Sequence, residues 1–199
     1  MQVIRDFFVE IDQLWSQQEA HGRKARLSII GCGALMLQAS YQRGTKDSDV
    51  FETTDLTDDV KRRLIAIAGA GTELHRRRNL YIDIVANGVP FLPHVPIWHP
   101  ALEISKALEH LELVVLDVVD VVVSKLKRFN SNDQSDIDAM IERELVPHER
   151  LIDRFRAAVD AFIGDARAEN LPKYVANLHR VERDMLLVSE TEIDLPSWI

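Results

Sequence analysis

Three aspartates stand in two short stretches that favour β-strands. Asp47 and Asp49 are two residues apart in DSDVF, and residues at i and i+2 of a strand point to the same face. Neighbouring carboxylates repel each other unless a cation lies between them, and hard oxygen ligands favour Mg²⁺ or Mn²⁺. Taken alone, the pair favours the simpler interpretation of two solvated acids at an edge strand.

Asp83 changes this comparison, because it lies inside the apolar stretch YIDIV. If its apolar neighbours face a core, Asp83 faces the other side and needs a partner or a water-filled cleft. One interpretation is a structural aspartate paired with an arginine of the run 76–78, which is expected to form a solvated turn. The other is a third carboxylate beside Asp47 and Asp49. Three such groups could hold two divalent ions for an in-line phosphoryl displacement.

A glycine turn, Gly31-Cys32-Gly33, follows the β-prone run LSII and precedes a helix-prone segment. Small residues let backbone N–H groups approach an anion, and a helix N-terminus adds partial positive charge. The alternative is a tight turn that binds nothing. The spacing matches neither the dinucleotide fingerprint nor a phosphate-binding loop that ends in Gly-Lys-Ser/Thr.

The elements that must position these residues follow from periodicity and turn signals. Strands are expected at 27–30, 47–51, 80–85 and 111–116, and the segment 90–100, with four prolines, should be irregular. Helices are expected at 3–18, 34–42, 56–68 (capped by Thr54 or Asp55), 118–129, 136–145, 149–167 and 171–188. The chain is therefore expected to be α/β over 1–116 and helical over 117–199, with Asp133, Asp136 and Asp138 as helix-cap and surface acids.

Composition is that of a globular protein, with 199 residues, 46% of them hydrophobic and 28% charged. The formal net charge of −8 disfavours nucleic-acid binding by bulk charge. The acidic excess lies wholly in the second half of the chain, so a polyanionic ligand should bind to the first half. One cysteine, no signal-peptide pattern and no long apolar run predict a soluble, cytoplasmic protein without a membrane span.

The stretch GCGALMLQASYQRGTKDSDVF resembles the nucleotidyltransferase superfamily of the polymerase-beta type, and in particular the AbiEii-like and related small bacterial nucleotidyltransferases. Their pattern is Gly-Gly-x-Ala-Leu, a helix, then Arg-x-Thr/Ser-x-Asp-x-Asp. The matching residues are Gly31, Ala34, Leu35, Arg43, Thr45, Asp47 and Asp49. A second similarity runs from Asp120 through Lys125 and Arg128 to Ile137. Cys32 departs from the usual Gly or Ser and affects the phosphate contact more than the metal site.

The resemblance implies a mixed sheet flanked by helices, followed by a C-terminal helical region, and a role for each candidate residue. Asp47 and Asp49 would hold a metal ion that binds the triphosphate. Asp83 would share a second metal ion and help to deprotonate an acceptor hydroxyl. The nucleotide-binding residues would be Gly31, Cys32, Gly33, Arg43, Thr45 and Lys125. For the cations Arg43 and Lys125, a solvated position or a salt bridge to a neighbouring helix is the alternative.

The resemblance favours an enzyme that uses Mg²⁺ or Mn²⁺ to move a nucleoside monophosphate from an NTP to an acceptor hydroxyl. The acceptor could be tRNA or another RNA, a protein or a small molecule, and the relatives include toxins of toxin–antitoxin pairs, which implies a cognate partner protein. The alternative is a non-catalytic module, an antitoxin or regulator, that binds a nucleotide or partner on the same fold. A third interpretation, a structural adaptor, would make Asp49 and Asp83 ordinary surface acids.

Overall fold

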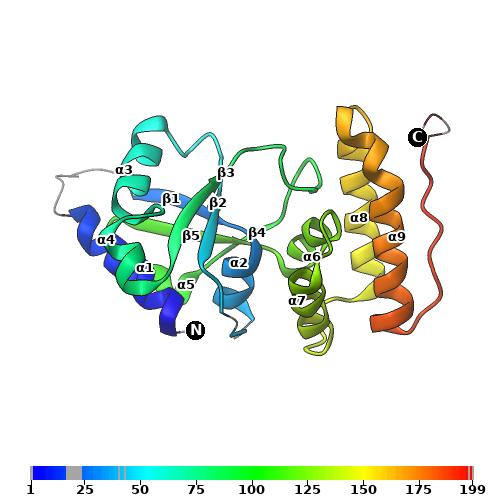
Figure 1. Ribbon diagram of the computed structural model, residues 1–199, viewed down its shortest axis with the longest axis horizontal. Helices are drawn as coiled ribbons and strands as arrows, with labels where there is room; N and C mark the ends of the chain where they lie inside the picture. The colour runs from blue at the N-terminus through cyan, green and yellow to red at the C-terminus, as the bar shows by residue number, and fades with distance from the viewer. Residues whose placement is uncertain (1, 17–23, 40, 43, 197, 199) are drawn as a thin grey trace. The chain divides into compact units, whose positions relative to one another are not determined.

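The chain forms two compact units in the computed structural model, which describes residues 2–16, 24–39, 41–42, 44–196 and 198 (Figure 1). Unit 1 comprises Met1–Val89 and Trp98–Leu116, and unit 2 comprises Pro90–Ile97 and Asp117–Ile199. The polypeptide therefore passes between the units three times.

Unit 1 is built on a five-stranded mixed sheet in the order β3-β2-β1-β5-β4. Its strands are β1 (Ala25–Ile29), β2 (Asp47–Phe51), β3 (Tyr81–Val85), β4 (Trp98–Pro100) and β5 (Leu111–Leu116). β2 pairs antiparallel with β1 and parallel with β3, while β5 pairs parallel with β1 and antiparallel with β4. β2, β1 and β5 therefore lie in the sheet interior, and β3, which carries Asp83, is at an edge of the described sheet.

The helices of unit 1 cover the sheet through apolar faces. They are α1 (Gln2–Ser16), α2 (Gly31–Gln38), α3 (Asp58–Ala68), α4 (Glu73–Arg78) and α5 (Leu102–Ser105). α1 buries Ile4, Phe7, Phe8, Ile11 and Trp15, which recur at helical spacing. α2 packs closely on β1 and β2, since a Cβ atom at Gly33 would lie 3.0 Å from Ser48 Oγ and 3.2 Å from Ile29 Cγ2.

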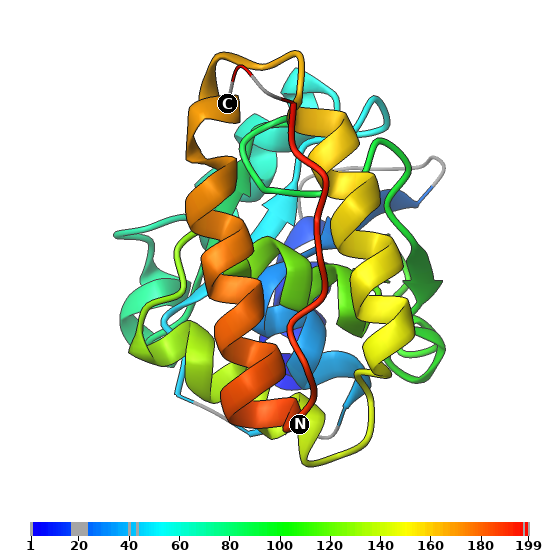
Figure 2. The same ribbon diagram turned by 90° about the vertical axis from the view of Figure 1, so that its right-hand side faces the viewer.

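Unit 2 is helical. Its elements are α6 (Val118–Leu126), α7 (Ser131–Ile141), α8 (His148–Phe162), a 3₁₀ turn (Ala166–Asn170), α9 (Leu171–Val181) and a π-helical turn (Glu182–Leu186). The extended segment after Leu187 runs alongside α8 and α9 (Figure 2). Thr191 fastens it, because its hydroxyl and its N–H both donate to the buried carboxylate of Glu182.

The expected mixed sheet flanked by helices, with a helical region after it, is confirmed. Three local expectations about unit 1 are wrong. Trp98–Pro100 form β4 although they lie in the proline-rich segment. Thr57, whose hydroxyl accepts from Val60 N–H, caps α3 in place of Thr54 or Asp55. Residues 76–78 form the end of α4 and not a turn. Within the described residues, no helix has the length and apolar character needed to span a bilayer.

Candidate active site

The strand register brings the three predicted aspartates to one face of the sheet. Asp49 pairs with Asp83 across the parallel β2 and β3, and Asp47 lies two residues before Asp49 on β2. In-register residues of neighbouring strands point to the same side, as do residues at i and i+2. Asp47 and Asp49 are half-buried and Asp83 is exposed. This set of side chains is called the acid face below.

Two of these carboxylates have defined hydrogen bonds to nearby groups. The Thr45 hydroxyl lies 2.8 Å from Asp47 Oδ1 and 3.1 Å from the Asp47 carbonyl oxygen, so its single proton is used on this residue. Asp83 Oδ1 accepts from the N–H of Ile84 at 2.9 Å. Thr45 was predicted to bind the nucleotide, and its geometry indicates that it orients Asp47.

The basic run 76–78, which could have neutralised Asp83, is directed elsewhere. Arg77 and Arg78 pair with Glu10 of α1. Arg76 donates to the carbonyl oxygen of Gly71 at 3.0 Å. The interpretation of Asp83 as a structural acid held by these arginines is therefore not supported.

The predicted glycine turn lies directly beside β2. Ile30 N–H donates to the carbonyl oxygen of Asp49 at 2.9 Å, and α2 begins at the next residue. Gly31 has a φ of +62°, and a Cβ atom there would lie 2.7 Å from Asp49 Oδ2. Glycine suits this position because it adopts a positive φ without strain and has no Cβ atom to clash with the carboxylate. Ile30, the N-cap residue of α2, makes no side-chain cap hydrogen bond, and the N–H groups of Gly31–Gly33, including that of the half-buried Cys32, begin the helix beside Asp49.

Tyr81 is a residue of this face to which the sequence analysis assigned no role. It pairs in register with Asp47 and lies two residues before Asp83. Burial and then the charges of Asp47, Asp83 and Asp49 raise the pKa of its phenol. Alternation along YIDIV was sufficient to place Tyr81 beside Asp83, but nothing in the sequence showed that β3 pairs with β2.

Two further predicted nucleotide contacts are the cations Arg43 and Lys125. Arg43 lies outside the described residues. Lys125 lies in α6 of unit 2, where its ammonium is 3.2 Å from Asp133 Oδ1 and 2.8 Å from Asp136 Oδ2. Asp133 does cap α7, but it and Asp136 are buried, so the expectation of surface acids is wrong for both. A phosphate contact by Lys125 stays a prediction, and it would compete with two carboxylates.

The acid face fits a divalent cation by its chemistry. Its carboxylate oxygens are the ligands that Mg²⁺ and Mn²⁺ prefer. Because Gly31 has no Cβ atom, the Asp49 carboxylate has room in its present position. Over the described ranges, however, no three His, Cys, Asp or Glu side chains meet as a formed metal site. Metal binding by Asp47, Asp49 and Asp83 therefore stays a prediction.

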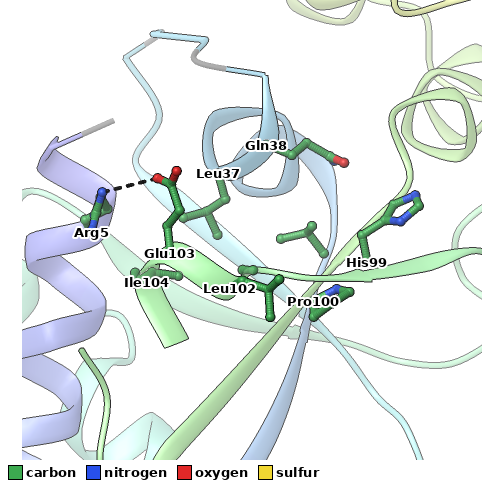
Figure 3. A pocket seen from close by; sticks show the side chains of 10 residues that line it. Arg5, Leu37, Gln38, His99, Pro100, Leu102, Glu103 and Ile104 are labelled. Carbon is green, nitrogen blue, oxygen red and sulfur yellow. Dashed lines mark ion pairs between the residues drawn. The ribbon is translucent and has the colours of Figure 1, made fainter. Parts of the chain in front are cut away.

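A separate hollow of about 230 Å³ lies on the opposite side of the sheet (Figure 3). Val115 in its lining pairs with Ile29, which pairs with Val50, and Val50 faces away from its neighbour Asp49. An ion pair of 3.7 Å between Arg5 and Glu103 crosses its rim. Among the described residues, its lining includes none of the predicted site residues.

A mixed sheet that carries Asp-x-Asp on one strand, a third aspartate on the next, and a glycine turn at the start of a helix beside them is the arrangement that the resemblance to the nucleotidyltransferase superfamily predicts. The chain belongs to the family described as "Nucleotidyltransferase of unknown function (DUF6036)", which it matches over residues 6–185. No curated protein and no solved structure matches it. The suspected superfamily is thus confirmed.

Proposed function

We propose that this protein is a metal-dependent nucleotidyltransferase that moves a nucleoside monophosphate from an NTP to an acceptor hydroxyl. The observation that supports this most is the register of β2 and β3, which sets Asp49 beside Asp83 with Asp47 on the same face. A new bond forms between the acceptor oxygen and the α-phosphorus. The bond between that phosphorus and the bridging oxygen breaks, and pyrophosphate leaves.

The residues of the acid face divide this task. Asp47, oriented by Thr45, and Asp49 would hold the metal ion that binds the triphosphate. Asp83 would take part in a second site, and its Oδ2, which the Ile84 N–H does not engage, would accept the proton of the acceptor hydroxyl. A divalent ion bound there offsets the negative charge of the phosphates and of the attacking and leaving oxygens. The N–H groups of Gly31–Gly33 would donate to phosphate oxygens.

The acceptor is an RNA, a protein or a small molecule, and a role as the toxin of a toxin–antitoxin pair remains part of this proposal. The alternative of a non-catalytic binding module predicts NTP binding without release of pyrophosphate. Because all three acids lie on one face beside the glycine turn, catalysis is the better-supported function.

The experiment is incubation with each labelled NTP, Mg²⁺ and a total cell extract, followed by separation of RNA, protein and small molecules. The wild type should transfer label to one fraction, and Asp49→Asn should lose this transfer because a neutral amide binds the cation far less well. Asp59→Asn, which changes an exposed acid of α3 paired with Arg62, is the matched control and should remain active. Transfer by Asp49→Asn at the wild-type rate would disprove the proposal.

A further inference from the structure

Tyr81 holds a fixed place on the acid face through its backbone. Its N–H donates to the carbonyl oxygen of Lys46 at 3.0 Å, and its register partner on β2 is Asp47. The glycine turn flanks β2 on the other side, since Ile30 donates to Asp49 across the strand pair of β1 and β2. Tyr81 and the glycine turn therefore lie on the two sides of the Asp47–Asp49 segment.

The aromatic ring of Tyr81 is oriented by a contact that does not involve its hydroxyl. The ring packs edge-on against His75, with 4.9 Å between centroids and an interplanar angle of 60°. His75 is itself fixed, because its Nδ1 accepts from the N–H of Gly71 at 2.9 Å. Removing only the phenolic oxygen should therefore leave the ring in place.

The phenolic O–H remains available as a donor. No described residue forms a hydrogen bond with it, and the side chain is only half-buried. The hydroxyl keeps its proton at neutral pH, because the ordinary pKa of a tyrosine phenol is about 10. A protonated phenol among carboxylates suits an anionic ligand, because phosphate oxygens are strong acceptors.

We propose that Tyr81 is a substrate-contacting residue whose phenolic O–H donates to a phosphate oxygen of the nucleotide on the acid face. The assignment to the nucleotide follows from the register, because Tyr81 lies opposite Asp47, one of the two acids proposed to hold the metal ion that binds the triphosphate. The inference rests on the proposed function and adds to it a residue that selects an anionic phosphate.

The test is Tyr81→Phe, which keeps the ring and removes the oxygen. Three quantities are measured: the dissociation constant of each NTP in the presence of Mn²⁺, the binding of Mn²⁺ alone by electron paramagnetic resonance, and the urea midpoint. We expect NTP binding to weaken about tenfold or more, the loss typical of a hydrogen bond to a charged group. Mn²⁺ binding and the urea midpoint should stay as in the wild type. Tyr174→Phe, which removes a phenolic oxygen in unit 2, is the matched control.

Each outcome separates the two proposals. NTP binding by Tyr81→Phe equal to that of the wild type overturns the role of Tyr81, and it leaves the proposed function intact if Asp49→Asn is inactive. Equal losses of NTP and Mn²⁺ binding would mark Tyr81 as structural and would also overturn the inference. A wild-type protein that binds no NTP would overturn both.

Discussion

Replacing Gly31 with alanine would place a methyl group against the carboxylate of Asp49. Gly31 has a φ of +62°, and the new Cβ atom would lie 2.7 Å from Asp49 Oδ2, well inside the ordinary contact range, which begins at 3.4 Å. The carboxylate belongs to a side chain on a paired strand, so it can avoid the methyl group only by rotating away from its present position.

Two separate costs follow from this change. The left-handed backbone conformation costs a non-glycine residue about 1–2 kcal/mol, partly offset by the lower conformational entropy of the unfolded alanine chain. The second cost falls on the site, because metal–ligand distances tolerate only about ±0.2 Å. Moving the Asp49 carboxylate should therefore weaken Mn²⁺ binding by roughly tenfold or more, similar to the loss of a group that orients a ligand.

Gly71→Ala separates the two costs. Gly71 has a φ of +84°, and a Cβ atom there would meet no described neighbour within 4 Å, so its substitution carries the backbone cost alone. Urea unfolding of both variants and titration with Mn²⁺, followed by electron paramagnetic resonance, are the assays. We expect similar losses of stability and a loss of Mn²⁺ affinity only in Gly31→Ala. Equal Mn²⁺ affinities in the two variants would refute the claim that Gly31 makes room for a metal-binding carboxylate.

Three further changes test other parts of the structure. Thr45→Val should weaken Mn²⁺ binding about tenfold by freeing Asp47, and Thr45→Ser should restore it; unchanged titrations would exclude an orienting role. Lys125→Met should lower the free energy of unfolding in urea by about 3–5 kcal/mol, because it leaves Asp133 and a second carboxylate buried without their ammonium. A stable variant with impaired NTP binding would instead support the phosphate role. Burial opposes ionisation of Asp133, but Arg128 and the Lys125 ammonium outweigh it and lower its pKa. Its stabilising effect is therefore complete above the unfolded pKa of about 4 and is lost as pH falls through the folded value, and Asp133→Asn should flatten the acid limb of the unfolding curve.

The sequence was sufficient to place the acids on strands, because acids alternate in DSDVF and YIDIV is a β-prone run bounded by Asn87-Gly88. It did not show which strands are neighbours. The pairing of β2 with β3 depends on how α3 and α4 return the chain. The sequence signal for α4 is weak, since ELHRRR carries a single apolar residue and only the Thr72 cap marks its start.

Tertiary contacts decided features that local reasoning left open or missed. Lys125 looks like a free cation in VVSKLKRF, but the chain turns at Phe129, which has a φ of +51°, and brings the buried acids of α7 to it. β4 was missed for a similar reason. Its three residues lie in a segment with four prolines, and pairing with β5 is what makes them a strand.

The excursion of Pro90–Ile97 into unit 2 bears on how this protein can be divided. The N–H of Ile97 donates to Asp120, and Arg154 donates to the carbonyl oxygen of Val95, so the segment depends on helices that follow much later. A single cut after Leu116 would therefore yield an N-terminal fragment in which Pro90–Ile97 has lost the helices that it contacts. Recombination could exchange these two units between proteins only by transferring two separate stretches of the gene at once.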